Sequence, residues 1–243
     1  MMFTRALYLF CAYLIILVIN GCSSGREVKK ENEVENSRAK KIINIAAEER
    51  KYIKENNIKE IEKVSFILDE KGNPVKGEKL STVRYNRNGY ITETDIYNSN
   101  GKVEYVYYYE YKNNLRVKTT RYTNDGKADK YYTYTYNKFN NKTKSTRYNL
   151  SQDMDKYYTY EYDESGNLIK ENWYDKDGKK EYSVEYEYDE NGRKTAAKSY
   201  NEDDDLIYQY NFKYDGRGNI IEEEKYDPDD DKTGIIQYIY RYY

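Results

Sequence analysis

The sequence predicts a mainly β protein, an antiparallel hairpin-repeat meander of about 14 strands that is coiled or partly closed, preceded by one N-terminal α-helix. Three observations support this fold class. Tyrosine supplies 34 of the 243 residues. The tyrosines recur with a period of 26 residues, divided into steps of about 12 and 14, as at Tyr162, Tyr174 and Tyr188. Turn-forming residues follow these tyrosines at a fixed offset.

Residues 1–21 have the pattern of a signal peptide. Their uncharged apolar run, residues 6–19, is shorter than the about 20 residues that a membrane-spanning helix needs. The run ends in Leu-Val-Ile-Asn-Gly-Cys at residues 17–22, which resembles the lipobox of bacterial lipoproteins. This resemblance implies cleavage before Cys22 and diacylation of Cys22. Ser23 resembles the residue found in lipoproteins sent to the outer membrane, so we expect the outer membrane or cell surface rather than the inner membrane. The alternative is an uncleaved N-terminal anchor, which also holds the protein at a membrane.

Three segments follow the predicted cleavage site. Residues 22–37 carry charges of both signs without an apolar period, which predicts a lipidated flexible tether. Residues 38–57 place Ile42, Ile45 and Ile53 near one helical face, which predicts an amphipathic capping helix. Residues 58–243 alternate with period two and form the predicted tyrosine-rich β-hairpin repeat domain.

The turns of this domain have a recurring composition. Tyr162 is followed by Asp163 and then by Gly166, which suits a three-residue hairpin loop with a left-handed glycine. In that register Asp163 faces Asn167. One turn, Asn113-Asn114, is a residue shorter and predicts a two-residue hairpin.

Alternation along the strands predicts one aromatic face and one polar face. The expected aromatic face includes Leu168, Tyr174, Tyr182, Tyr188, Tyr200, Tyr208, Tyr214 and Tyr226. The expected polar face includes Glu171, Glu181, Glu185, Thr195, Gln209 and Glu223. Because so large an aromatic face is not left in water, we expect the sheet to coil around it, with the helix plugging one end. The competing geometry is an open twisted sheet whose tyrosines are covered by Lys and Glu stems.

Several of the hairpins resemble a known repeat. The strings YDESGNL at 162–168, YDENGR at 188–193 and YDGRGNI at 214–220 resemble the YD repeats of Rhs-type proteins and, more loosely, bacterial MORN-variant repeats. The resemblance covers roughly residues 64–243 and implies a hairpin sheet that spirals into a hollow shell. Rhs-type proteins act in surface interaction and toxin delivery. The period here is longer than in those proteins, so only the hairpin-sheet architecture is expected to transfer.

A cluster of aromatic residues is predicted on the polar face. In the expected register Trp173 lies opposite Tyr157, Tyr131 lies opposite Arg147, and Tyr108 continues the row. Such a patch suits carbohydrate stacking or a protein hot spot. The alternative is cross-strand pairing that only stabilises an exposed sheet.

Composition excludes several kinds of chemistry. The chain has no histidine, and its two cysteines are Cys11, in the predicted signal peptide, and the predicted lipidation site Cys22. Histidine-dependent nucleophiles and histidine-ligated zinc are therefore excluded, and we expect no cofactor and no catalytic residue. The net charge of −2 argues against a nucleic-acid partner. The acidic turn at 227–234 spaces carboxylates like a calcium loop but lacks its glycine and final glutamate, so calcium binding and a solvated turn both remain open.

These observations together predict a lipid-anchored bacterial cell-envelope protein. Its repeat sheet is expected to act as a non-catalytic binding or interaction module for an envelope or host protein or a glycan. One alternative is a structural or spacer lipoprotein without a dedicated ligand. The other is a glycan hydrolase that uses a pair of carboxylates.

Overall fold

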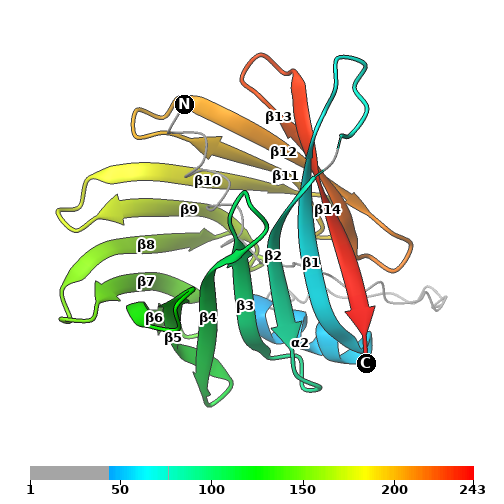
Figure 1. Cartoon of the computed structure of the whole chain (residues 1–243). Helices are drawn as coiled ribbons and strands as arrows, with labels where there is room; N and C mark the ends of the chain where they lie inside the picture. The colour runs from blue at the N-terminus through cyan, green and yellow to red at the C-terminus, as the bar shows by residue number, and fades with distance from the viewer. Residues whose placement is uncertain (1–43, 76) are drawn as a thin grey trace, which may run out of the picture.

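The computed structural model describes residues 44–75 and 77–243 and shows a closed antiparallel barrel (Figure 1). Each strand pairs with its neighbours in sequence, and β1 pairs with β14 to close the barrel. The predicted meander is confirmed, and the open-sheet alternative is wrong. The strands are β1 Ile58–Ile67, β2 Glu78–Tyr85, β3 Ile91–Tyr97, β4 Val103–Lys112, β5 Leu115–Thr123, β6 Ala128–Tyr136, β7 Lys142–Asn149, β8 Met154–Tyr162, β9 Leu168–Asp175, β10 Lys180–Tyr188, β11 Lys194–Tyr200, β12 Leu206–Tyr214, β13 Ile220–Tyr226 and β14 Lys232–Tyr242.

Helix α2, Ile45–Glu55, lies at one end of the barrel (Figure 1). The side chain of Asn44 caps it by accepting a hydrogen bond from the N–H of Ala47 at 3.1 Å. The Tyr52 hydroxyl donates to Asn219 Oδ1 at 2.7 Å and so ties the helix to a hairpin at the start of β13. The helix therefore plugs the barrel as expected. The predicted signal peptide, the tether and residues 38–43 of the predicted helix lie outside the described residues.

The helix approaches a second hairpin closely on its other side. A Cβ added to Gly89 would lie 2.2 Å from the backbone oxygen of Arg50, so only glycine fits this contact. Arg50 also donates from Nη1 to the backbone oxygen of Asn114 at 2.9 Å. The helix is thus attached to hairpins on both sides of the barrel end. None of the described helices is long and apolar enough to cross a membrane.

The hairpin turns follow the predicted chemistry. The N–H of Asp163 donates to the oxygen of Asn167 at 2.9 Å, and Gly166, at φ 92°, donates to the oxygen of Asp163 at 3.0 Å. The two-residue turn is also confirmed, because Asn113 and Asn114 have φ values of 51° and 65°.

Each hairpin is followed by a register shift that changes which side chains point inward. Tyr162 pairs with Leu168, but Glu161 pairs with Lys170, so Ile169 is an extra residue. Such a β-bulge reverses the alternation of faces along the strand that contains it. The expected common face for all hairpin tyrosines is therefore wrong. The tyrosines next to a hairpin turn that point outward are Tyr97, Tyr122, Tyr148, Tyr174, Tyr200 and Tyr226.

The same shifts move two acidic residues from the expected polar face into the barrel. Glu171 is 6% exposed and contacts the buried Trp173, and Glu223 is also 6% exposed. Sequence alternation alone could not place them, because the extra residue after each turn has no distinctive side chain.

The remaining hairpin tyrosines point inward and share one hydrogen bond. The hydroxyl of Tyr162 donates to the backbone oxygen of Lys142, twenty residues earlier and on the adjacent strand, at 2.7 Å. Lys142 comes immediately before the bulge of β7, where the ladder of backbone hydrogen bonds is disrupted. The Tyr162 hydroxyl supplies a hydrogen-bond donor to the Lys142 carbonyl at this disruption. The same bond joins Tyr111 to Ile91, Tyr136 to Arg116, Tyr188 to Leu168, Tyr214 to Lys194 and Tyr240 to Ile220.

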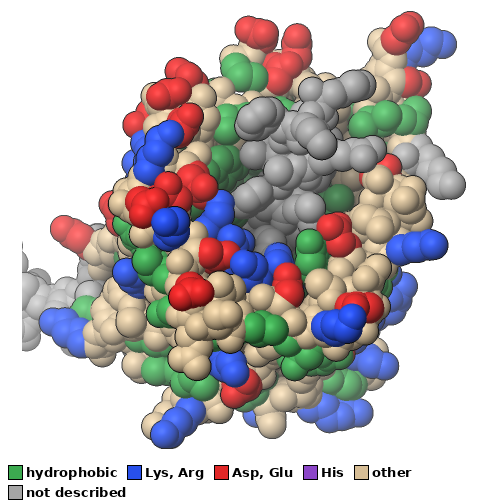
Figure 2. Space-filling model, turned by 60° about the vertical axis from the view of Figure 1, so that its left-hand side comes forward, with side chains coloured by type: hydrophobic (Ala, Val, Ile, Leu, Met, Phe, Trp, Pro, Cys, Tyr) green, Lys and Arg blue, Asp and Glu red, His purple; other side chains and the backbone are tan. Residues whose placement is uncertain are grey.

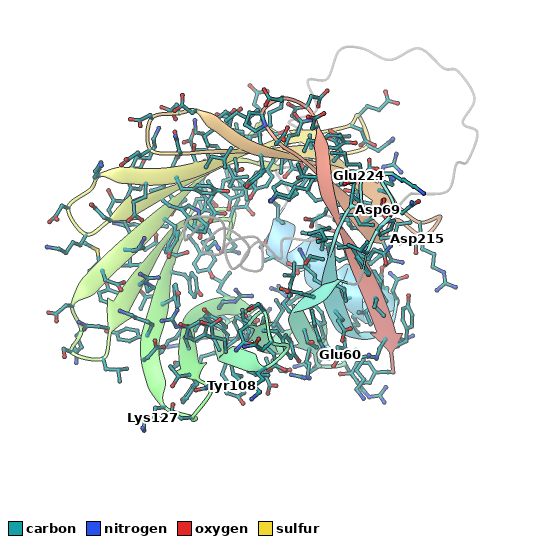
Figure 3. The ribbon with its side chains drawn as sticks, turned by 45° about the horizontal axis from the view of Figure 1, so that its top comes forward. Glu60, Asp69, Tyr108, Lys127, Asp215 and Glu224 are labelled. Atoms are coloured by element: carbon teal, nitrogen blue, oxygen red, sulfur yellow. The ribbon has the colours of Figure 1, made fainter. Side chains whose placement is uncertain are left out.

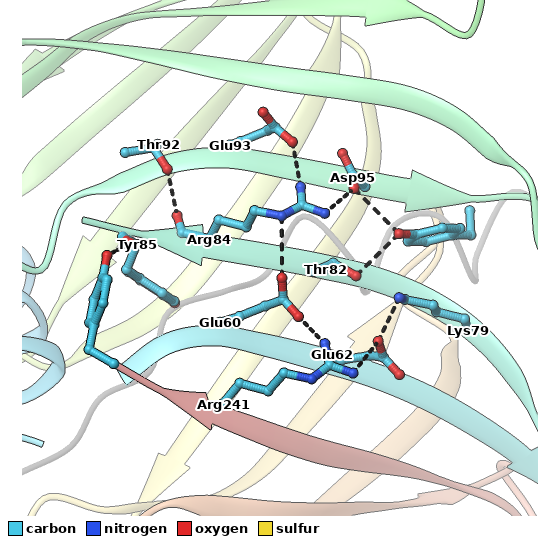
Figure 4. A network of polar contacts seen from close by, with 12 residues as sticks. Glu60, Glu62, Lys79, Thr82, Arg84, Tyr85, Thr92, Glu93, Asp95 and Arg241 are labelled. Atoms are coloured by element: carbon cyan, nitrogen blue, oxygen red, sulfur yellow. Dashed lines mark hydrogen bonds and ion pairs between the residues drawn. The ribbon is translucent and has the colours of Figure 1, made fainter. Parts of the chain in front are cut away.

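A charged network on the outer wall crosses the seam where the barrel closes (Figure 4). Arg84 on β2 contacts Glu60 on β1 at 3.3 Å and Asp95 on β3 at 2.8 Å. Glu60 also pairs with Arg241 on β14. The network therefore connects four successive strands, which gives it more geometric definition than an isolated surface pair.

The inward hydroxyl bond is testable at one repeat. We expect Tyr162→Phe to lower the free energy of unfolding by about 1 kcal/mol, because it leaves the Lys142 carbonyl without this donor. The matched control is Tyr174→Phe, on the outer wall, which should change stability by less than about 0.5 kcal/mol. Urea denaturation of both variants measures the difference, and equal effects would contradict this role of the inward hydroxyl.

Candidate functional site

The barrel encloses a cavity of about 370 Å³ between helix α2 and the inner wall. Its lining comes from α2, from the strands β3 to β9 and from the hairpins that join them at the helix end. The space-filling view shows basic side chains gathered along the wall of a hollow (Figure 2). The cavity is the candidate functional site.

On the inner wall, strands that contribute tyrosines alternate with strands that contribute charged, hydroxyl-bearing and apolar side chains. The even-numbered strands β4, β6 and β8 contribute the tyrosines. The odd-numbered strands β5, β7 and β9 each place three residues inward, the first before the bulge and two after it. These triplets are Arg116, Thr119 and Arg121 on β5, Lys142, Ser145 and Arg147 on β7, and Leu168, Glu171 and Trp173 on β9.

Two of the inward cations are neutralised by carboxylates. Arg121 contacts Asp129 through two nitrogens, with Nη2–Oδ2 at 2.5 Å and Nε–Oδ1 at 2.9 Å. Arg147 Nε lies 2.8 Å from Asp155 Oδ1, and Asp155 Oδ2 is 2.7 Å from Lys130 Nζ. These pairs sit at the end of the barrel wall away from helix α2.

The other two inward cations of β5 and β7, Arg116 and Lys142, lie over tyrosine rings. The Arg116 guanidinium carbon is 4.4 Å from the centroid of the Tyr109 ring, and Lys142 Nζ is 4.0 Å from that of Tyr160. No carboxylate among the described residues forms an ion pair with either cation. Burial lowers the pKa of Lys142 to about 8.

Two carboxyl groups also face the cavity. Glu49 is the helix residue that points into the barrel, and its Oε1 atom is shielded from solvent and accepts no hydrogen bond from the described residues. Burial raises its pKa to about 7, against the opposing effect of Arg116 and other cations. Glu171 accepts a hydrogen bond from the Trp173 indole at 2.9 Å, and burial raises its pKa as well.

These carboxyl groups correct the expectation that the acidic residues all line a wet, flat face. The sequence contained a signal for Glu49, because it shares a helical face with the buried Ile45 and Ile53, four residues away on either side. A charge on the apolar face of a capping helix indicates an inward position. Glu171 had no comparable signal, since its facing depends on the bulge.

The five residues of the predicted aromatic patch are divided between the two sides of the wall. Trp173 and Arg147 point inward, and Trp173 pairs with Tyr158, at 5.1 Å between ring centroids, rather than with Tyr157. The predicted opposition of Tyr131 and Arg147 is also wrong, because Tyr131 pairs with Tyr148. Tyr108 is 46% exposed on the outer wall (Figure 3). The bulges explain these errors, because each one reverses the facing of the residues that follow.

The outward tyrosines instead form three cross-strand pairs on neighbouring hairpins. Tyr131 stacks on Tyr148 with centroids 5.0 Å apart, and Tyr157 stacks on Tyr174 at 4.8 Å. The third pair, Tyr108 and Tyr122, has an edge-to-face geometry at 5.5 Å. Three residues of the predicted patch, Tyr108, Tyr131 and Tyr157, lie in this row on the outer surface.

The acidic turn at 227–234 has the same hydrogen bonds as the other hairpin turns. Asp227 Oδ1 accepts from the N–H groups of Asp229 at 3.1 Å and Asp231 at 3.0 Å. Within residues 44–75 and 77–243, no three acidic or sulfur side chains gather in a way that could hold a metal ion.

The comparisons with known proteins concern the repeat region and its architecture. Residues 150–200, which span β8 to β11, match a family described as a protein of unknown function (DUF2963). No curated protein matches the sequence.

Among solved structures, a porin-like protein from Bacteroides uniformis has 14% identity and a TM-score of 0.45, covering 76% of this chain and 98% of that chain. A porin-like protein from Bacteroides vulgatus has 13% identity and a TM-score of 0.42, with the same coverage. A chain of the Photorhabdus luminescens Tc holotoxin pore has 13% identity and a TM-score of 0.32, covering 72% of this chain and 11% of that chain.

The cost of the inward cations can be measured at Lys194. It is the first inward residue of β11, is 2% exposed, and lies 4.1 Å from the centroid of the Tyr186 ring. Burial lowers its pKa to about 8. We expect Lys194→Met to raise the free energy of unfolding at pH 7 by about 1–3 kcal/mol, because the buried charge is removed.

The advantage of this variant should shrink as the pH rises from 8 towards 10.5, the ordinary value for lysine. In this window the folded parent chain holds Lys194 neutral while the unfolded chain still binds the proton, so the parent gains stability with pH. Lys198→Met, on the outer wall and paired with Glu187 at 2.6 Å, is the matched control. Urea denaturation across this pH range checks both statements, and a destabilised Lys194→Met at pH 7 would refute them.

Proposed function

We propose that this chain is a lipid-anchored protein of the bacterial cell envelope whose barrel binds a small ligand in its interior without chemical conversion. The lipobox-like segment ending at Cys22 supports the anchor, and residues 22–37 would separate the barrel from the membrane surface. The outer membrane or cell surface is the proposed location.

The observation that carries the binding role is the polar cavity. Its volume of about 370 Å³ lies within the range of small-molecule sites. A barrel of this size has room for a ligand in addition to its own side chains. The cavity contains Glu49 Oε1, a buried acceptor that receives no hydrogen bond from the residues that the structure describes, and such buried polar groups call for an explanation. A bound ligand would provide one.

The charged side chains of the outer wall support our proposal that the barrel is surrounded by water. Outward-facing residues of neighbouring strands form ion pairs, such as Lys213 with Glu224 at 2.8 Å and Lys170 with Glu185 at 2.8 Å. The row of outward tyrosine pairs favours a second candidate function, contact with a glycan or with a protein of the envelope or host. Tyrosines at such positions combine an apolar ring with a polar hydroxyl.

A ligand screen with two matched variants separates these functions. The full chain, purified in detergent, is tested by thermal shift and native mass spectrometry against small metabolites and short glycans. We expect binding to be lost in Ser145→Phe, which adds bulk at a buried cavity position, and to persist in Tyr157→Thr on the outer wall. Circular dichroism checks that both variants fold.

The pattern of results assigns the site. Binding lost in Tyr157→Thr and kept in Ser145→Phe would move the site to the outer wall. Recovery of a chemically altered ligand, with conversion lost in Glu49→Gln or Glu171→Gln, would favour the hydrolase. A chain that binds nothing in the screen would favour the spacer role.

The lipid anchor is tested by a pair of cysteine variants. We expect Cys22→Ala to abolish incorporation of an alkyne-labelled palmitate and to release the protein from the membrane fraction of expressing bacteria. Cys11→Ala, within the predicted signal peptide, should leave both properties unchanged. Lipid labelling that persists in Cys22→Ala would show that the attachment site was wrongly assigned.

A further inference from the structure

We propose that the barrel cavity recognises an anionic small molecule, with a carboxylate or phosphate group held by Arg116 and Lys142 and an apolar body against the tyrosine wall. The inference rests on the proposed interior binding role and names the class of ligand. The site lies between helix α2 and the inner wall, at the end of the barrel that the helix plugs.

The two cations converge on one part of the wall. Arg116 is the first inward residue of β5 and Lys142 is the first inward residue of β7, with β6 between them. The Arg116 guanidinium carbon and Lys142 Nζ lie 5.9 Å and 5.6 Å from the centroid of the same ring, that of Tyr134. The two cations therefore flank the Tyr134 ring, and both line the same cavity, where we place a single anionic group in contact with them.

The wall that carries these cations is held in place by hydrogen bonds. The hydroxyls of Tyr136 and Tyr162 donate to the backbone oxygens of Arg116 and Lys142, each at 2.7 Å. The Tyr134 hydroxyl donates to Thr119 Oγ1 at 2.6 Å. Because these bonds fix both the backbone and the rings, little ordering would accompany ligand binding.

The charge balance of the cavity favours an anion. Arg121 and Arg147 have carboxylate partners, whereas none of the described carboxylates pairs with Arg116 or Lys142. Glu49 and Glu171 act on these cations only at longer range, and burying a charge without a direct ion-pair partner is costly. An anionic ligand would offset that cost by contacting both cations directly.

Glu49 links the site to pH. Its carboxyl group is faced by Arg50 on its own helix, by Arg116, Lys142 and Lys194 on the barrel wall, and by the hydroxyl of Tyr85 on β2. With its pKa raised by burial to about 7, Glu49 takes up a proton when a second negative charge enters the cavity. Anion binding should therefore tighten as the pH falls from 8 to 6.

Benzoate and its neutral isostere benzamide test the charge requirement, with inorganic phosphate as a second anion. Titration calorimetry uses the full chain in detergent. We expect benzoate to bind at least about tenfold more tightly than benzamide at pH 6, and about tenfold more weakly at pH 8 than at pH 6. The single tryptophan, Trp173, lines the cavity, so its fluorescence reports on binding independently.

Variants then locate the anion. Arg116→Met and Lys142→Met should each weaken benzoate binding by about tenfold or more. Because Lys142→Met also removes a buried charge, it should not lower the melting temperature, and lost binding then reports on the site rather than on folding. Lys144→Met is the matched control, because Lys144 lies on the outer wall over the Tyr157 ring. Glu49→Gln should remove most of the pH dependence while retaining binding.

Four results would overturn the inference. Equal binding of benzoate and benzamide, both lost in Ser145→Phe, would refute the anionic ligand while leaving the interior binding role intact. Charge-dependent binding that survives Arg116→Met and Lys142→Met would place the anion elsewhere. If neither anion binds, and the ligands found by screening are neutral, the inference fails on its own. If nothing binds at all, it falls together with the proposed function.

Discussion

The fold depends on how each hairpin corrects its own register shift. The extra residue after every turn disrupts the backbone ladder, and at the hairpins near helix α2 a tyrosine hydroxyl from the adjacent strand bonds to the carbonyl beside the disruption, as Tyr188 does to Leu168 at 2.8 Å. Because this bond joins the end of one strand to the start of the strand before it, it connects each hairpin at the helix end to the next hairpin at that end. The bond recurs around the barrel, where the twisted sheet closes as β1 meets β14.

The sequence was sufficient to predict the strands, the turns and the concave aromatic face, because those depend on local periodicity and on turn residues such as Asp163, whose side chain accepts hydrogen bonds from the turn, and Gly166, which adopts a positive φ without steric cost. It was insufficient to predict on which side of the sheet the side chains after a bulge lie. Ile169 is an ordinary strand residue, and nothing in its side chain indicates that it is unpaired. One such residue was enough to exchange the sides of Trp173 and Tyr174, and with them the composition of the candidate site.

Charged side chains in the interior of the barrel are distributed unevenly. On the β1–β13 side, Lys63 and Glu223 form a buried ion pair at 3.1 Å, so the inward charges there compensate each other. On the β5–β7 side, Arg116 and Lys142 lie over tyrosine rings and form no ion pair with a described carboxylate, so Glu49 and Glu171 act on them only at longer range. The same fold therefore contains a region of directly paired charges and a region whose cations have no direct ion-pair partner among the described residues. This asymmetry lies along the wall that borders the cavity.

Tyrosine suits this interior better than leucine or phenylalanine would. Its ring fills the space between strands, its face holds a cation as Tyr160 holds Lys142, and its hydroxyl bonds to the polar residues of the adjacent rows, as Tyr109 does to Thr94 at 2.8 Å. A leucine wall could close the barrel, but it has no aromatic faces to stabilise buried lysine and arginine side chains that form no ion pair with a carboxylate. The tyrosine repeat is thus the feature that lets one sequence period both build the barrel and keep its cavity charged.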